Sequence, residues 1–186
     1  MAIPEARKYT EEEYLAIAGD KRCELINGYI VDMSPAAGID HQWISANIHT
    51  DIMNYIRSQK GKCRALATPQ VKFNDDLYVV PDIIVACDKS KMDGKKHYGA
   101  PDWVIEIVSP GNVSNDYYNK VNLYKENGVK EYWIVDPRKF FIMVHIWDGD
   151  FSDVVNYNWN EDIPVYIYKD STPPLIINIA RSMEEF

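Results

Sequence analysis

The sequence predicts an α/β fold, of the α+β kind, in which helices pack on the faces of a central mixed β-sheet. Its amphipathic and apolar segments follow one another in the order helix, strand, strand, strand, helix, strand. A short helix and a β-hairpin are expected before this core, and additional strands after it. The 186 residues suit one large domain better than two small ones, so a single domain over residues 1–186 is expected.

The N-terminal part is expected to form a helix and then a hairpin. Residues 10–13, with the sequence TEEE, match a capping box, and the helix should end near Gly19. Asn27-Gly28 between two apolar runs is a strong signal for a two-residue hairpin turn. In that register Glu24 lies opposite Val31 and shares a sheet face with apolar side chains. A carboxylate on an apolar sheet face is costly, so Glu24 is expected to have a partner or a functional role.

The core is expected to begin with a long amphipathic helix. Asp40 offers an N-cap, Gly61 offers an end, and isoleucines recur between them at spacings of three and four residues. The stripe consists of His41, Ile44, Ile48, Ile52 and Ile56.

Strands are predicted for the apolar segments at residues 65–73, 78–87, 103–108 and 131–136. The second of these is almost wholly apolar, which is typical of a central strand. A helix is expected over residues 114–127, with Gly128 past its end. Two strands within 140–157, joined by a turn at Asp148-Gly149, predict a C-terminal hairpin.

The bulk composition narrows the class of protein. Residues are 46% hydrophobic and 12% aromatic, enough for a well-filled core. The three cysteines are odd in number and form no CxxC pair, which predicts neither a disulfide framework nor a zinc site. The absence of a signal-peptide core and of a long apolar run favours a cytoplasmic protein outside the membrane. The net charge of −8 argues mildly against tight nonspecific DNA binding.

Two carboxylates stand where a core is expected. Asp82 interrupts the apolar run VVPDIIV, and Glu106 lies in WVIEIV on the strand face that also carries Val104 and Val108. A bare ionised carboxylate in apolar surroundings is costly, so it must be paired, protonated or bound to a cation. Hard oxygen ligands favour Mg²⁺ or Mn²⁺ over zinc. We therefore predict a metal site on Asp82 and Glu106.

A lysine follows on the next helix. Asp116, Lys120 and Tyr124 are spaced by four residues and share one helical stripe. A lysine that reaches the metal site would stabilise negative charge at a phosphate or orient an attacking water. The alternative is a solvated lysine that pairs with Asp116.

These residues carry a resemblance to a known family. Pro81-Asp82 followed by Glu106 within an αβββαβ order resembles the PD-(D/E)XK nucleases. More narrowly, blocks spread over about residues 10 to 160 are similar to the Uma-type putative restriction endonucleases of bacteria. The blocks are ELINGYI, PDIIV, APDWVIEIVSPGN, the D-x3-K-x3-Y spacing of Asp116 to Tyr124, and GVKEYWIVDP.

The resemblance implies a restriction-endonuclease-like core and a Mg²⁺-dependent endonuclease that hydrolyses DNA. It implies that Glu24 joins Asp82 and Glu106 in the catalytic site. Val108 replaces the lysine that the superfamily carries two residues after the acid, and the family pattern implies that Lys120 takes its role. The rival hypothesis is a catalytically inactive nuclease-fold protein that acts as a DNA-binding or assembly module.

Plainer interpretations stay open for each residue. Asp82 after a proline would also suit the cap of a turn, and Glu106 would be satisfied by a buried hydrogen bond. Glu24 would serve as an ordinary edge-strand acid. His41 at the start of the apolar stripe is more typical of a helix-start or core histidine than of a ligand.

Two further expectations concern partners. Four lysines in the loop at residues 89–99 are candidates for DNA contacts, although they also suit a solvated loop: Lys89, Lys91, Lys95 and Lys96. The aromatic side chains of the C-terminal strands predict a homodimer, in which a twofold axis would place two sites for double-strand cutting.

Overall fold

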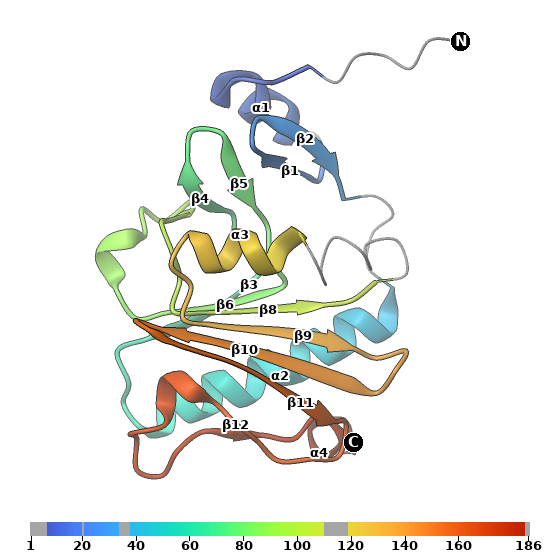
Figure 1. Ribbon diagram of the computed structural model, residues 1–186, viewed down its shortest axis with the longest axis vertical. Coiled ribbons are helices and arrows are strands. Elements are labelled where there is room, and N and C mark those ends of the chain that lie inside the picture. Colours follow the sequence, from blue (N-terminus) through green and yellow to red (C-terminus); the bar gives the residue numbers. More distant parts are fainter. Residues whose placement is uncertain (1–6, 20, 34–37, 110–118, 185–186) are drawn as a thin grey trace.

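The computed structural model describes residues 7–19, 21–33, 38–109 and 119–184. The described residues form two large β-sheets (Figure 1) and a two-stranded sheet of β12 (Ile163–Pro164) and β13 (Ile176–Ile177). The larger sheet has six strands, in the spatial order β11 (Phe151–Asn158), β10 (Phe141–Asp148), β9 (Glu131–Asp136), β8 (Trp103–Ile107), β6 (Ile83–Ala86) and β3 (Arg64–Ala67). Only β8 and β9 run parallel; the other neighbours are antiparallel. The sheet is therefore mixed, as predicted.

The smaller sheet has five strands, in the order β2 (Tyr29–Asp32), β1 (Cys23–Ile26), β5 (Leu77–Val79), β4 (Val71–Asn74) and β7 (His97–Tyr98). The other elements are α1 (Glu11–Ala18), α2 (Ile39–Ser58), η1 (Lys89–Lys91), α3 (Lys120–Glu126), β12 (Ile163–Pro164), η3 (Tyr166–Tyr168), β13 (Ile176–Ile177) and α4 (Ile179–Glu184). None of the described helices combines the length and the apolar character needed to cross a bilayer.

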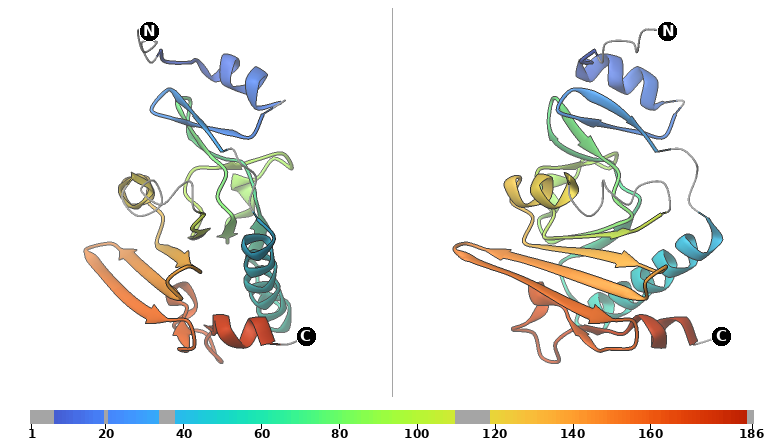
Figure 2. Two further views of the ribbon diagram at one scale, coloured as in Figure 1. Left: turned by 90° about the vertical axis from the view of Figure 1, so that its right-hand side faces the viewer. Right: turned by 45° about the vertical axis from the view of Figure 1, so that its right-hand side comes forward.

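Helices α2 and α3 lie on opposite faces of the larger sheet (Figure 2). The apolar stripe of α2, from Ile44 to Ile56, packs with Ile83, Ile105 and other side chains of one face. Tyr124 of α3 packs with Val104 and further side chains of the other face. The elements α2, β3, β6, β8, α3 and β9 reproduce the predicted αβββαβ order.

The local signals near the N-terminus are confirmed. Thr10 forms a capping box with Glu13 at the start of α1. The hairpin turn is at Asn27-Gly28, and Glu24 pairs with Val31. Helix α2 begins two residues earlier than expected, with Gly38 rather than Asp40 at the N-cap position. Asp40 lies in the first turn, where its negative charge still suits the helix dipole.

Two predicted strands are each divided between the two sheets. The chain leaves the larger sheet after Ala67, where Thr68 has a positive φ and Pro69 follows. It forms β4 and β5 in the smaller sheet and returns at Pro81-Asp82. Proline has no N–H to donate to a ladder, which explains a change of sheet at these points. The sequence prediction missed both changes of sheet, because the apolar pattern continues through them.

The expectation of no disulfide was wrong. Cys63 and Cys87 form one, although they are 24 positions apart in the sequence. The antiparallel pairing of β3 with β6 places Arg64 opposite Ala86. Cys63 directly precedes Arg64 and Cys87 directly follows Ala86, so the two cysteines lie side by side at one end of the strand pair. Cys23 is free and buried. Because the pairing is cross-strand, no local spacing rule reveals it.

The later elements depart from the prediction in small ways. The C-terminal hairpin pairs Asp148 with Phe151, so its turn consists of residues 149–150 rather than 148–149. Helix α3 begins at Lys120 within the described residues; residues 114–118 of the predicted helix, with Asp116, lie outside them.

Candidate active site

Two of the predicted site acids meet where β6 and β8 lie side by side. Ile83 pairs with Ile105, so continuing the antiparallel register by one residue places Asp82 opposite Glu106. Asp82 Oδ2 accepts a hydrogen bond of 2.8 Å from the backbone N–H of Ile107, the neighbour of Glu106. Asp82 directly precedes β6, just after the break in pairing at Pro81. Its side chain can therefore contact groups outside the strand ladder.

Glu106 is held from the side of α3. Its Oε1 atom accepts hydrogen bonds from Lys120 Nζ at 2.8 Å and from the Tyr124 hydroxyl at 2.7 Å. The two donors are one helical turn apart on α3 and therefore share its inner face. Lys120 is only 4% exposed and Glu106 only 5%. The interpretation of Lys120 as a solvated surface lysine is therefore wrong.

Glu24 joins the same group from the smaller sheet. It is 1% exposed, and its Oε1 atom accepts hydrogen bonds from Lys120 Nζ at 3.2 Å and from the Val80 N–H at 3.0 Å. The Lys120 ammonium thus bridges Glu24 and Glu106, which are far apart in the sequence. Glu24 is not an ordinary edge-strand acid, because β1 lies between β2 and β5.

The charge balance of this group is unusual for a protein interior. A single buried ammonium faces two buried carboxylates, and each ion loses its hydration. Burial, reinforced by the nearby charges of Glu106 and Glu24, raises the pKa of Tyr124 well above its ordinary value. The hydroxyl therefore remains a proton donor to Glu106 across the physiological pH range.

A cavity of about 560 Å³ opens beside Asp82. His41 Nε2, on the first turns of α2, lies 3.1 Å from Asp82 Oδ2. The polar side chains that line the cavity include those of Arg22, His41, Gln42, Ser45, His49 and Asp82. The interpretation of His41 as a plain core histidine missed this contact, because helical periodicity does not show what the first turn of a helix faces.

The donor set suits a hard divalent cation in its chemistry. Among the described residues, no group of three or more His, Cys, Asp or Glu side chains is arranged to hold a metal ion. Mg²⁺ does not require such a cage, since it is usually held by one or two carboxylates and keeps waters and phosphate oxygens as its other ligands. Asp82 and Glu106, on adjacent strands, are the oxygen donors of this kind at the site.

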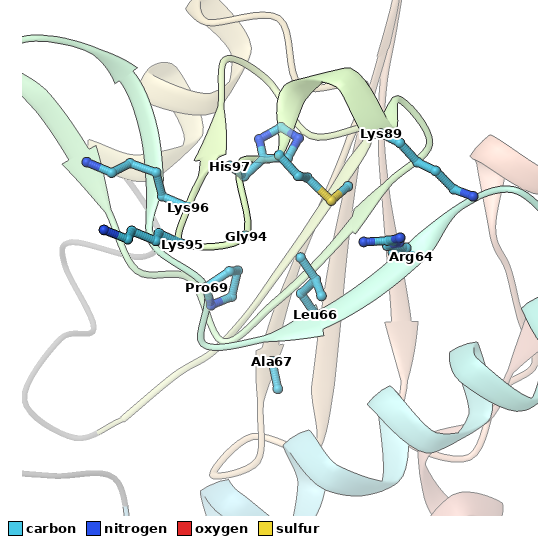
Figure 3. A pocket seen from close by; sticks show the side chains of 10 residues that line it. Arg64, Leu66, Ala67, Pro69, Lys89, Gly94, Lys95, Lys96 and His97 are labelled. Atoms are coloured by element: carbon cyan, nitrogen blue, oxygen red, sulfur yellow. The ribbon is translucent and has the colours of Figure 1, made fainter.

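The four predicted DNA-contacting lysines separate into two groups. Lys89, Lys95 and Lys96 line a second cavity, of about 510 Å³, together with Arg64 (Figure 3). Lys91 instead donates a hydrogen bond of 3.3 Å to the Ala100 carbonyl oxygen and lines a different depression. Ala67 lines both the second cavity and the cavity beside Asp82, so these two adjoin.

Comparison with solved structures gives the class of fold. A crystal structure of a putative nuclease belonging to DUF820 from Anabaena variabilis ATCC 29413 matches with a TM-score of 0.72 at 22% sequence identity. The match covers 94% of this chain and 97% of that one. The protein therefore has the mixed α/β architecture of a nuclease-like fold. A comparison with curated proteins gave no match.

The family follows from the sequence itself. The model of the Uma2 family, described as putative restriction endonucleases, matches residues 11–164. That range contains Glu24, Asp82, Glu106 and Lys120. The chain belongs to the Uma2 family, which confirms the resemblance that the sequence blocks indicated.

Proposed function

We propose that the protein is a divalent-metal-dependent endonuclease that hydrolyses phosphodiester bonds in DNA. The observation that carries the proposal is the buried lysine that bridges Glu24 and Glu106, next to Asp82 and its open polar cavity. A protein interior tolerates such a charged group only at a cost in stability, and polar groups that converge beside a cavity are typical of functional sites. Membership of a family of putative restriction endonucleases supports the same reaction.

Each side chain has a distinct role in this proposal. Asp82 and Glu106 would hold Mg²⁺ or Mn²⁺, and the bound cation would neutralise charge on the phosphate and favour an attacking hydroxide. Lys120 donates to the phosphate oxygen on which negative charge grows. Glu24 holds the Lys120 ammonium in place through its own anchor on the Val80 N–H.

Two residues complete the proposed site by positioning the acids. Tyr124 fixes Glu106 Oε1 from α3, and His41 fixes Asp82 Oδ2 from α2. Because the two helices cover opposite faces of the sheet, the acids are held from both sides. The cavity between α2 and Asp82 is the route by which a DNA strand would approach.

A second candidate is a nuclease-fold protein without catalysis that binds DNA or serves in an assembly. The salt bridges from Lys120 to both acids favour it, because they satisfy part of the site internally. Val108, buried on the Glu106 face, and the net charge of −8 favour it as well. A cleavage assay separates the two candidates.

The assay compares supercoiled and single-stranded DNA with Mg²⁺, with Mn²⁺ and with EDTA. We expect nicking or cutting only with metal, and its loss in Asp82→Asn. Asp170→Asn, an exposed acid that follows η3, is the matched control and should cleave like the parent protein. Cleavage that persists in Asp82→Asn would contradict the proposed site.

Metal binding has a readout that does not depend on cleavage. At 100 times Kd the cation adds about 2.7 kcal/mol to the stability of the native state, and each kcal/mol raises Tm by roughly 2–4 °C at this chain length. Melting curves with EDTA and with Mn²⁺ should differ for the parent protein and coincide for Asp82→Asn. If the parent protein melts at the same temperature with EDTA and with Mn²⁺, the proposed metal dependence is contradicted.

We also propose that the protein forms a homodimer through its C-terminal hairpin. β11 is an edge strand of the larger sheet, and Phe151 and Val154 on it are about half exposed. An edge with unpaired backbone groups and apolar side chains is suited to pairing with a second copy. Light scattering at micromolar concentration should give twice 21.5 kDa, and Val154→Lys should shift the particle to the monomer. A parent protein of 21.5 kDa would contradict the dimer.

A further inference from the structure

The second cavity has a composition that the proposed reaction does not explain. Its charged walls come from Arg64 on β3 and from Lys89, Lys95 and Lys96 in the loop before β7 (Figure 3). None of the described residues that line it is acidic. A concentration of positive charge in a protein of net charge −8 indicates an anionic ligand.

The nearby acids do not neutralise this charge. Within the described residues, Arg64, Lys89 and Lys95 form no salt bridge of 4.0 Å or less. Asp93, the acid in the same loop, accepts instead from the backbone N–H groups of residues 95 and 96 and from the Tyr98 hydroxyl. The charges of Arg64, Lys89 and Lys95 are therefore available to a ligand, whereas the Lys96 ammonium lies over the Tyr78 ring, 5.1 Å from its centroid.

Part of the remaining lining is apolar. Leu66, Pro69 and Met92 contribute hydrocarbon and thioether surface to the same cavity. A free inorganic anion gains nothing from such surface, whereas the flat face of an aromatic base does. Methionine is the most adaptable of the three because it has several rotatable bonds and a polarisable sulfur atom.

His97 adds an unsatisfied polar atom. Its Nδ1 lies 3.1 Å from the Gly99 carbonyl oxygen, which can only accept, so Nδ1 carries the proton. Burial lowers the pKa of His97, so the ring is neutral and Nε2 is an acceptor. Nε2 is buried and has no hydrogen-bond partner in the part of the chain that the structure describes. An orphan acceptor at a ligand-sized cavity indicates an N–H donor on the ligand.

We propose that this cavity binds one unpaired nucleotide of a DNA strand. Lys95 contacts its phosphate from one side of the cavity, Leu66 and Pro69 contact the base, and His97 Nε2 accepts from the N–H group on the pairing edge of the base. Because Nε2 is buried, contact with the base requires a shift of the side chains that cover this atom. Duplex pairing occupies the same N–H group, so the cavity selects single-stranded or extruded nucleotides.

The position of the cavity links it to the proposed cleavage site, and this step alone rests on the proposed function. Ala67 lines both cavities, and the Thr68 N–H donates to the Asp82 carbonyl oxygen at 2.8 Å. Only the segment from Ala67 to Pro69 therefore separates the bound nucleotide from the cavity at Asp82. A nucleotide held there would fix the position of the strand relative to the scissile phosphate.

The test uses calorimetric titration in EDTA, where no cleavage occurs. The probes are a 2′-deoxynucleoside 5′-monophosphate, the matching deoxynucleoside and inorganic phosphate. The monophosphate should bind at least roughly tenfold more tightly than either fragment, since it makes both sets of contacts. A short single-stranded oligonucleotide should displace it, and a blunt duplex of equal length should not.

Three variants assign the contacts. Lys95→Glu, at an exposed position, should weaken monophosphate binding by roughly tenfold or more. His97→Phe should weaken monophosphate binding but leave phosphate binding unchanged. Lys139→Glu, an exposed charge reversal outside the cavity lining, is the matched control and should bind like the parent protein.

The outcomes separate this inference from the proposed reaction. Equal affinity for phosphate and monophosphate would reduce the cavity to a general anion site and overturn the inference. The absence of saturable binding would also overturn it, even if the protein cleaves DNA with metal. Monophosphate binding that Lys95→Glu abolishes would support the nucleotide site even in a protein without cleavage activity.

Discussion

Glu106 and Glu131 are two buried acids on neighbouring parallel strands, and they differ in what compensates them. Glu106 on β8 faces α3 and contacts a lysine and a tyrosine. Glu131 on β9 is 0% exposed, and its hydrogen-bond donors among the described residues are uncharged: the Trp133 indole N–H at 2.7 Å and the backbone N–H groups of Tyr166 at 3.1 Å and Ile167 at 2.9 Å.

The two arrangements serve different purposes. The donors to Glu131 satisfy its oxygens and attach η3 to the sheet, but burial outweighs them and raises its pKa to about 7. A structural attachment therefore needs no buried cation. Lys120 brings a second desolvated ion into the fold and needs two acids to hold it, which costs more than a hydrogen-bonded network of similar size. Such a cost on the α3 face alone agrees with a functional role for that face.

Among the variants that test this comparison, removal of the Lys120 ammonium should have the largest effect on stability and cleavage. Lys120→Met leaves Glu24 and Glu106 without their shared cation and should lower the free energy of unfolding by about 3–5 kcal/mol. Cleavage should fall by roughly 10² to 10³ under conditions where the variant is folded. Urea denaturation and the DNA assay measure the two effects.

Two further variants control for other causes of that loss. Lys125→Met, at an exposed position on the same helix, should unfold and cleave like the parent protein. Adding Glu106→Gln to Lys120→Met removes a stranded charge and should recover stability but not activity. If Lys120→Met is as stable and as active as the parent protein, the bridge is not a functional group.

Glu131 should produce a smaller, pH-dependent effect. Its folded pKa of about 7 lies above the ordinary value of 4.5, so protonation favours the folded state. This contribution is complete below about pH 4.5 and is lost as the pH rises through about 7, a change on the order of 3 kcal/mol. The free energy of unfolding, followed from pH 5 to pH 8, should therefore fall in the parent protein relative to Glu131→Gln.

The matched control for this titration is Glu126→Gln, which removes an exposed acid on α3. It should keep the pH dependence of the parent protein. A Glu131→Gln variant with the same slope as the parent protein would mean that Glu131 is ionised throughout this range. The contrast between the two faces of the sheet would then disappear.

The sequence pattern was sufficient to predict several of the residues that lie on the α3 face of the sheet. Period-two alternation placed Glu106 with Val104 and Val108 on one face of its strand, and their core contacts agree. The hairpin at Asn27-Gly28 identified Glu24 as an acid on an apolar face, and it is buried. These inferences succeeded because each depends on spacing within one element.

Contacts between distant segments were beyond such reasoning. Nothing local links Cys63 to Cys87, or His41 to Asp82, because both pairs depend on how separate elements pack. The change of sheet at Pro81 was missed for the opposite reason, since the apolar run continues through it. Glu131 was taken as part of an ordinary strand, because the donors of η3 come from more than 30 residues away.

Substitution of Tyr124 also tests the comparison between Glu106 and Glu131, and it has the smallest expected effect on stability. Tyr124→Phe removes one hydrogen bond to Glu106 Oε1 but keeps the ring, which lies 4.8 Å from the Tyr132 ring between centroids. The loss of a hydrogen bond to a charged acceptor should cost about 1.5–3 kcal/mol in the free energy of unfolding. Urea denaturation is the measurement, and Tyr29→Phe on the exposed hairpin strand is the control.

The size of that loss relative to Lys120→Met decides which donor dominates at Glu106. Lys120 remains in Tyr124→Phe, so the carboxylate keeps its cation and the variant should lose less stability than Lys120→Met loses. Cleavage should fall only slightly, because the hydroxyl positions Glu106 and does not contact the phosphate in the proposed mechanism. An equal loss in the two variants would mean that the hydroxyl compensates Glu106 as strongly as the ammonium does. Glu106 would then resemble Glu131, an acid held mainly by neutral donors, and Lys120 would belong to Glu24 alone.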